Sequence, residues 1–286
     1  MQKNKTENKI FLSFDTEEFT IPMEFNSPDV SLNNNTTLCA NGVKRVLDLL
    51  EEKKVKATFF VTGYFAVKEK QIVKEIVRKG HEVGSHSYFH TRKIVAQRDV
   101  IKKDIQESKD ILEKVTGNQI VGFRAPRCLV DQQLLDILDE VGFQYDSSVH
   151  PAIVPGAYYN TKYPLNPYFP DKENIHLSGE RKILEIPITV IPWIRFPISW
   201  WWMRNIGLWI TKMGTKWNIK KRHVILYFHP WEFVKIDPIQ KVPNHIIHKT
   251  GEQFLSQLSE FINYCKENNM NFDVMKKIEC RGYQKS

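Results

Sequence analysis

The sequence has few cysteines and no motif that would pair their thiols. The four cysteines are scattered, without a C-x-x-C or a dense disulfide framework, so reduced thiols are expected at Cys39, Cys128, Cys265 and Cys280. The first ten residues lack the apolar core of a secretory signal, which favours a cytoplasmic location. The most apolar stretch, residues 188–210, is broken by two prolines and two arginines and does not predict a membrane-spanning helix.

The net charge is basic, but no basic tail is present. The chain of 286 residues carries 41 Lys and Arg against 33 Asp and Glu, a formal charge of +8. Its cations are spread through the predicted helices, which argues against nucleic-acid binding and is compatible with an anionic partner such as a phosphorylated carrier. With 42% hydrophobic residues, the composition is that of a globular protein with a sizeable core.

Short β-rich runs alternate with amphipathic helical segments. Seven strand-like runs are recognised, at residues 9–15, 56–63, 81–86, 120–126, 143–148, 182–188 and 223–230. Repeated βα units predict a parallel sheet, and about seven of them favour a closed or nearly closed barrel over an open sheet. We expect one α/β domain over residues 1–286, with Pro- and aromatic-rich inserts at about 150–180 and 188–220 forming loops and short helices at one end.

Several helix boundaries are also marked by residue type. Asp131 is expected to cap the start of one helix, and Gly142 to end it. A later helix is expected to begin with a capping box formed by Thr250 and Gln253.

Ionisable side chains stand at the ends of five predicted strands. They are Asp15, His86, Arg124, Asp146 and His229. In a parallel barrel these strand ends face one mouth, where active sites assemble. Taken singly, each has an ordinary explanation, because a strand-end Asp is commonly a turn or cap residue and a strand-end His is usually solvated.

The segment HEVGSHSYFH, residues 81–90, places His86 and His90 four positions apart. Two imidazoles one helical turn apart, with one carboxylate, supply three ligands and leave a coordination position open, as catalytic zinc sites do. Glu17 lies two residues beyond Asp15 and is a candidate for that carboxylate, which would free Asp15 to act as a base.

Six motifs occur in the order typical of the polysaccharide deacetylases of the NodB-homology class, and the chain resembles that family over roughly residues 10–235. The motifs are SFDTEEF, HSYFH, FRAPR, YDSS, EIPI and YFHPWE, beginning at residues 13, 86, 123, 145, 185 and 227. The resemblance implies a deformed (β/α)7 barrel that binds one divalent metal through an acidic residue, His86 and His90. It also implies Asp15 as general base, Arg124 as the residue that orients it, and His229 as general acid.

The chain departs from the commonest family pattern at Thr16, where a second aspartate would bind the metal. A subset with a D-x-E opening points to Glu17, with Glu18 as the fallback. The resemblance further makes the backbone N–H of Arg127 an oxyanion donor and places Trp231 near the mouth as a residue on the substrate side. Asp146 becomes either a supporting partner of the site or a cap. Zinc is the expected metal, and cobalt, nickel, manganese or iron also suit two histidines and a carboxylate.

The implied reaction is hydrolysis of an acetamido group on an amino sugar of a polysaccharide or glycan precursor. Trp200, Trp201 and Trp202 cannot all face one core on a helix, so at least one is expected at a surface, against a sugar, a dimer partner or a membrane. In the membrane version, Arg195 and Arg204 meet lipid phosphates and the saccharide is lipid-linked. Two other functions stay open: a metal-free, allantoinase-like amide hydrolase on the same barrel, and a saccharide-binding module without catalysis.

Overall fold

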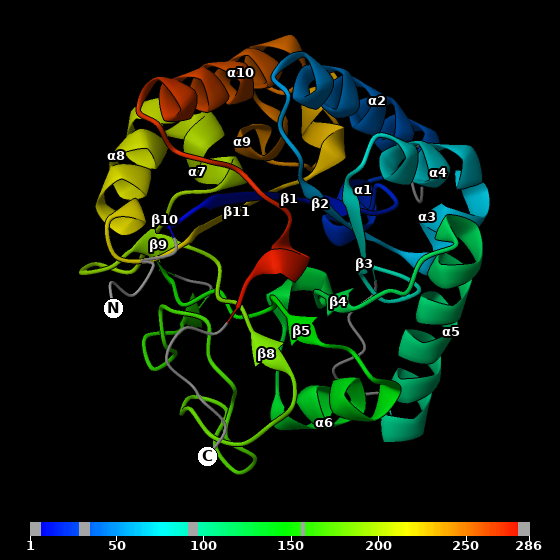
Figure 1. The fold of residues 1–286 in the computed structure, drawn as a ribbon. Helices are drawn as coiled ribbons and strands as arrows, with labels where there is room; N and C mark the ends of the chain where they lie inside the picture. The colour runs from blue at the N-terminus through cyan, green and yellow to red at the C-terminus, as the bar shows by residue number, and fades with distance from the viewer. Residues whose placement is uncertain (1–6, 29–34, 91–96, 156–157, 280–286) are drawn as a thin grey trace.

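The fold is built around one curled parallel sheet. The structure is a computed structural model that describes residues 7–28, 35–90, 97–155 and 158–279. The sheet has seven strands in the order β11-β1-β2-β3-β4-β5-β8. In chain order these strands are β1 (Ile10–Thr16), β2 (Thr58–Val61), β3 (Glu82–Ser85), β4 (Gly122–Phe123), β5 (Tyr145–Asp146), β8 (Leu184–Glu185) and β11 (Val224–Phe228). Figure 1 shows the strands curling around the centre with helices outside, which confirms the expected α/β barrel.

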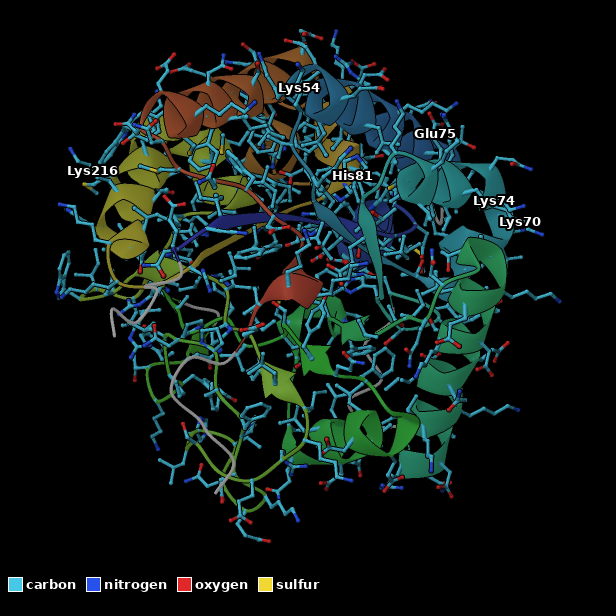
Figure 2. All side chains as sticks on the ribbon, viewed as in Figure 1. Lys54, Lys70, Lys74, Glu75, His81 and Lys216 are labelled. Carbon is cyan, nitrogen blue, oxygen red and sulfur yellow. The ribbon has the colours of Figure 1, made fainter. Side chains whose placement is uncertain are left out.

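The helices cover the outer face of the sheet. They are α1 (Ile21–Glu24), α2 (Thr36–Glu52), α3 (Gly63–Lys68), α4 (Lys70–Arg78), α5 (Arg98–Thr116), α6 (Gln132–Val141), α7 (Trp200–Asn205), α8 (Leu208–Ile219), α9 (Asn244–Ile247) and α10 (Glu252–Glu267). Charged side chains such as Lys54, Lys70, Lys74 and Lys216 project outward, whereas His81 lies inside (Figure 2). Among the described residues, no helix has the length and apolar character needed to cross a membrane.

The interior of the barrel is filled by side chains from its strands. Phe11, Phe60, Tyr145 and Ile225 form a buried cluster that is separate from the larger core beneath the helices. The short helix η4 (Met275–Lys277) crosses the amino-terminal end, where Met275 N–H donates to Thr58 Oγ1 at 3.0 Å. That end is therefore closed, and the carboxyl ends of the strands are left to form the site.

The predicted helix boundaries were right in one case and wrong in another. Asp131 Oδ1 accepts from Leu134 N–H at 2.8 Å and caps α6, and Gly142 ends that helix with a φ of 82°. The capping box at Thr250 does not form. Instead, α10 begins after Gly251, and Thr250 Oγ1 donates to the Ile247 carbonyl within the preceding turn.

The inserts do more than form loops at one end of the barrel. The first contains the two-stranded sheet β6 (Ile153–Val154) and β7 (Tyr158–Tyr159), and the second contains β9 (Val190–Ile191), β10 (Phe196–Pro197), α7 and α8. Helix α8 lies in the outer ring beside α10 and ahead of β11 (Figure 1), so it supplies the helix of the last βα unit. The expectation of loops and short helices was wrong at α8. Thr189 N–H donates to the Ile225 carbonyl at 3.0 Å, so the chain after β8 approaches β11 and nearly closes the barrel.

Candidate functional site

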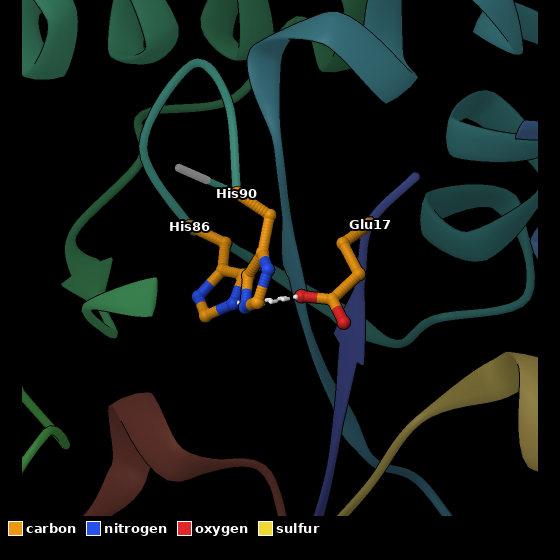
Figure 3. Close-up of side chains that lie close together, drawn as sticks. All are labelled: Glu17, His86 and His90. Atoms are coloured by element: carbon orange, nitrogen blue, oxygen red, sulfur yellow. Dashed lines mark ion pairs between the residues drawn. The ribbon is translucent and has the colours of Figure 1, made fainter. Parts of the chain in front are cut away.

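Three side chains meet at the carboxyl ends of β1 and β3 in an arrangement that fits a metal. Glu17 Oε2 lies 3.3 Å from His86 Nε2 and 2.9 Å from His90 Nε2. One ligand atom from each residue falls within 4.8 Å of the other two. Figure 3 shows Glu17 at the end of β1. It faces the imidazoles of His86 and His90, which belong to the loop after β3.

The two histidines are held by a loop, and the helical turn expected for residues 86–90 is absent. Ser87 adopts a φ of 63°, which turns the chain back so that both rings face Glu17. The loop is fixed by backbone bonds, because Gly63 N–H donates to the Ser87 carbonyl at 2.9 Å. His86 Nδ1 lies 2.8 Å from the Arg124 carbonyl, so a proton on Nδ1 leaves Nε2 with its lone pair facing the cluster.

The acidic residue in the cluster is Glu17, and its neighbours have other contacts. Glu18 accepts from the His90 backbone N–H at 2.8 Å and from Thr62 Oγ1 at 3.0 Å, so it supports the loop. The Thr16 hydroxyl donates to the Phe14 carbonyl at 3.2 Å within β1. The structure therefore brings Glu17, and not the fallback Glu18, to the two imidazoles.

The chemistry of the three residues fits a divalent cation. Glu17 Oε2 and His86 Nε2 are buried and make no hydrogen bond of good geometry, as expected of atoms whose partner is a metal. Burial pushes the pKa of Glu17 upward, but the charge of His90 and the close approach of both imidazoles outweigh it and leave that pKa far below its ordinary value. The Glu17 carboxylate is thus ionised, as a metal ligand would need to be.

Asp15 is paired with a fully buried arginine. Arg124 Nη1 donates to Asp15 Oδ1 at 2.8 Å and to Ser13 Oγ at 2.8 Å, while Nε donates to the Ser147 carbonyl at 2.9 Å. Burial lowers the pKa of Arg124, but the Asp15 carboxylate more than offsets this and the pKa is raised. The guanidinium is therefore a permanent charge that fixes Asp15. Among the described residues, the group whose ligand atoms lie close enough to hold one metal ion consists of Glu17, His86 and His90, without Asp15.

His229 approaches the same mouth from β11 and has a carboxylate behind it. Glu232 Oε2 accepts from the His229 backbone N–H at 3.0 Å and lies 3.4 Å from His229 Nδ1. Burial lowers the pKa of His229, but the hydrogen bond to Glu232 and the charges of Glu17, Glu232 and Asp15 raise it overall. The surroundings of His229 thus favour its protonated form, with Nε2 as its open nitrogen.

Glu232 and Arg204 were missed by the sequence analysis. Arg204 of α7 is fully buried, and its Nη2 donates to the Ile246 carbonyl at 2.6 Å and lies 3.5 Å from Glu232 Oε1. The spacing His229-x-x-Glu232 could have indicated the first residue, but no local signal marks the second. The expectation that Arg204 meets lipid phosphates was wrong, because a neighbouring carboxylate and carbonyl hold it inside.

The tryptophans near His229 support its ring. Trp231 is only 2% exposed and stacks on His229 with ring centroids 5.5 Å apart, so it lies beneath the mouth and is not open to a substrate. Trp200 meets the His229 ring edge-on at 4.8 Å and donates from Nε1 to Tyr227 Oη at 2.7 Å. All of Trp200–Trp202 are partly buried, whereas Trp193, Trp209 and Trp217 are exposed.

Two further predicted residues lie around the base. Arg127 has a φ of 58°, and its Nη2 pairs with Glu24 Oε1 at 2.8 Å, which ties the short helix η2 (Pro126–Cys128) to α1. Asp146 Oδ1 accepts from Ser148 Oγ at 2.6 Å, and Ser148 Oγ accepts from Ala125 N–H at 2.8 Å, so Asp146 supports the chain beside Arg124.

Asp146 also has a buried acidic neighbour, Glu185, that the sequence analysis did not single out. Burial raises the pKa of both carboxyl groups, and their mutual hydrogen bond couples them. One shared proton would satisfy Asp146 Oδ2 and Glu185 Oε2, which otherwise lack partners.

Comparison with known proteins identifies the family. The family model described as polysaccharide deacetylase matches residues 2–145, and a second, described as a domain of unknown function (DUF3473), matches residues 147–277. The peptidoglycan-N-acetylmuramic acid deacetylase PdaA of Bacillus subtilis is 32% identical over 101 residues, which are 35% of this chain and 38% of that protein. The curated relatives are thus matched over less than half of their length.

Solved structures show the same fold over nearly the whole chain. A protein from Mycobacterium smegmatis assigned to the polysaccharide deacetylases superposes with a TM-score of 0.60 at 19% identity, covering 96% of each chain. A family 4 carbohydrate esterase pseudoenzyme from Bacillus anthracis superposes with a TM-score of 0.54 at 14% identity, covering 96% of this chain and 66% of that one. The matching family model covers just over half of the sequence, and the chain belongs to the polysaccharide deacetylase family.

Proposed function

We propose that the protein is a metal-dependent hydrolase that removes an N-acetyl group from an amino sugar of a polysaccharide or glycan precursor. The proposal rests on one observation: a carboxylate and two imidazoles converge beside an arginine-paired aspartate and a carboxylate-backed histidine. Among its relatives, PdaA is named for deacetylating an N-acetylated sugar of peptidoglycan. The cluster contains the ligand types of a catalytic zinc site, and cobalt, nickel, manganese or iron would suit the same donors.

Glu17, His86 and His90 would hold one divalent ion at the mouth. Such an ion supplies a Lewis acid for the acetyl oxygen and lowers the pKa of water from 15.7 toward about 7. The three ligands come from the ends of β1 and β3, which lie on either side of β2 in the sheet. The backbone N–H of Arg127, in the loop after β4, is proposed as an additional donor to the developing oxyanion.

Asp15 would take the proton of the attacking water. Its partner Arg124 donates to Oδ1, which leaves Oδ2 as the basic atom. Because the guanidinium is fully buried and bonded on several sides, the carboxylate cannot rotate freely. A positioned base of this kind typically contributes about 10²–10⁴ in rate.

His229 is placed to protonate the departing nitrogen. An amide nitrogen leaves poorly as an anion, so collapse of the tetrahedral intermediate needs an acid at that side. Glu232 faces Nδ1 and leaves the Nε2 proton to be given to the amine. The charges of Asp15 and Glu17 both act on His229, which supports a common site for the proposed acid, base and metal ligands.

Metal content and acetate release test the proposal together. The protein is purified without chelators, bound metal is measured by mass spectrometry, and acetate release is followed on acetylated oligosaccharides and peptidoglycan fragments. We expect about one divalent ion per chain, lost in Glu17→Ala and His86→Ala. Asp15→Asn should keep the ion and lose acetate release by about 10²–10⁴. Exposed His248 provides the matched control, His248→Ala, which should change neither quantity.

Two other results would favour other functions. If no metal binds even when supplied, but a cyclic ureide is hydrolysed, the protein is a metal-free amide hydrolase. If metal and saccharide bind without acetate release, it is a binding module, and the existence of a pseudoenzyme with the same fold makes that a fair competitor.

A further inference from the structure

Residues 186–231 differ from the rest of the chain in charge and in tryptophan content. They contain all seven tryptophans and seven Lys or Arg but no Asp or Glu. The rest of the chain contains 34 Lys and Arg and all 33 Asp and Glu, so its charges almost cancel. Almost the whole net charge of +8 therefore arises in residues 186–231. The even spread of cations noted in the sequence analysis therefore conceals one unbalanced region.

Part of this segment forms an exposed surface, here called the α8 face. It consists of Trp193 and Ile194 from the β9–β10 turn and of Trp209, Lys216, Trp217 and Lys220 from α8 and its C-cap. Trp193, Trp209 and Trp217 are 72%, 58% and 39% exposed, and Ile194 is 59% exposed. Residues 209, 216, 217 and 220 recur at helical spacing, so they share the side of α8 that faces away from the barrel. The Trp193 and Trp217 rings touch edge-on at 4.9 Å, which joins the turn to the helix.

The lysines of the α8 face are available for an anionic ligand. Within the described residues, neither Lys216 nor Lys220 forms an ion pair, and Figure 2 shows Lys216 projecting outward from α8. Lys212, on the neighbouring side of the helix, is different, because its Nζ pairs with Glu260 of α10 at 2.6 Å. Exposed indole rings between unpaired ammonium groups are typical of surfaces that lie at a membrane interface, where the rings enter the headgroup layer and the lysines meet phosphates.

We propose that the α8 face docks the protein on a bilayer that contains anionic lipids. A symmetric contact with a second copy is disfavoured, because it would bring the lysines of both copies into one interface and the α8 face contains no carboxylate to pair with them. A saccharide is disfavoured because the rings are exposed on α8 and the β9–β10 turn. Helix α8 lies in the outer ring of helices (Figure 1), whereas Glu17, His86 and His90 lie at the carboxyl ends of β1 and β3. Docking would bear directly on the site, since α7 immediately precedes α8 and its Trp200 contacts His229. An acetylated sugar carried on a lipid would then be presented at the surface on which the enzyme sits.

Vesicle co-flotation of the full chain tests the proposal. We expect binding to phosphatidylcholine vesicles that contain phosphatidylglycerol, and little to phosphatidylcholine alone. Lys216→Glu/Lys220→Glu should weaken binding roughly tenfold or more, since each cation near an anionic surface contributes substantially. The Trp193→Ala/Trp209→Ala/Trp217→Ala variant should also fail to float. Lys70→Glu/Lys74→Glu, a charge-matched control on exposed α4, should bind like the wild type.

Acetate release from a short soluble saccharide separates this proposal from the proposed function. The α8-face variants should retain that activity, because none of their residues belongs to the site. The proposal is overturned if the wild type does not float, if flotation is independent of phosphatidylglycerol, or if the α8-face variants float like the wild type. It is also overturned if light scattering shows that those variants instead dissociate a dimer.

Discussion

The two sides of the candidate site are built in different ways. On the base side, Asp15 and Arg124 form a short, fully buried ion pair, and each comes from a strand end in the first half of the sheet. On the acid side, His229 is partly open to solvent and is held by Glu232, which in turn lies beside Arg204 from the second insert. The first arrangement depends on the barrel alone, whereas the second depends on a helix added to it.

This difference indicates which side of the site can change its pKa and its substrate contacts without altering the sheet. In the proposed function, the base and the metal ligands need a fixed geometry, and strand ends of one sheet provide it. The proposed general acid needs a suitable pKa and meets a variable leaving group, and an insert can supply those properties without altering the sheet. The two family models divide the chain near residue 146, and His229 with its supports lies in the second region while Asp15 lies in the first.

The largest effect is expected on the base side. Arg124→Met removes the partner of a buried carboxylate and should lower the free energy of unfolding by about 3–5 kcal/mol, because Asp15 is left as an uncompensated charge. Acetate release per folded molecule should also fall sharply. Urea denaturation and acetate assays at matched folded fractions measure the two effects.

Arg181 provides a matched control for that substitution. It is a second buried arginine, and its Nη1 pairs with Asp136 at 2.6 Å away from the site. Arg181→Met should reduce stability and leave the activity of the folded fraction unchanged. If both variants lost stability but kept the activity of the folded fraction, Arg124 would serve only to hold strands together. The contrast between the two sides of the site would then fail.

A smaller effect, with a distinct signature, is expected on the acid side. His229 must carry a proton to act as the acid, so the rate should fall as pH rises through its raised pKa. Glu232→Gln removes a charge that raises that pKa, so the fall should begin at lower pH, with a loss of roughly 10- to 100-fold above it. The profile of kcat/KM against pH measures the shift.

The acid-side control uses a carboxylate outside the site. Glu260→Gln removes a charge that pairs with Lys212 on the outer surface and should leave the profile in place. If the fall in kcat/KM at high pH occurred at the same pH in Glu232→Gln as in the wild type, the raised pKa of His229 would be due to Asp15 and Glu17. The insert would then not set the pKa of the proposed acid.

The sequence predicted the base side better than the acid side for a physical reason. Periodicity and motif order locate residues at or just after strand ends without tertiary information. The residues located in this way are Asp15, Glu17, His86, His90 and Arg124. The choice of Glu17 over Glu18 needed the structure, because it depends on how the loop after β1 meets the loop after β3. The packing of α7 brings Trp200 against His229 and Arg204 beside Glu232, and this packing leaves no local pattern in the sequence.

Glu185 is a further residue whose partner could not be predicted from the sequence, although it lies within a strand of the sheet. Its strand was predicted, but a carboxylate in a buried strand gives no sign of which neighbour it will meet across the sheet. Tyr145 pairs with Leu184 and Asp146 with Glu185 in the parallel register, and this alone brings the two acids together. Register was not predictable from either segment by itself.

The smallest expected effect concerns this acid pair, which supports the base side through Ser148. Both carboxyl groups have raised pKa values in the folded protein, chiefly because they are buried, so the folded state retains protons that the unfolded state releases above ordinary carboxyl pKa values. The stability that this provides is fully present in acid and is lost as pH rises through the folded pKa values, by at most about 1.4 kcal/mol per pH unit for each proton.

Glu185→Gln should therefore flatten the pH dependence of stability. The amide can donate to an ionised Asp146 in place of the shared proton, so the variant should be as stable as the wild type in mild acid and more stable, by about 1 kcal/mol, in mild alkali. Urea unfolding over that pH range measures the difference, with exposed Glu107→Gln as control. Because Asp146 would keep its bond from Ser148, acetate release should be retained. A variant that lost both stability and activity at every pH would instead show that the acid pair holds the chain beside Arg124, and that the base side depends on more of the sheet than the Asp15–Arg124 pair.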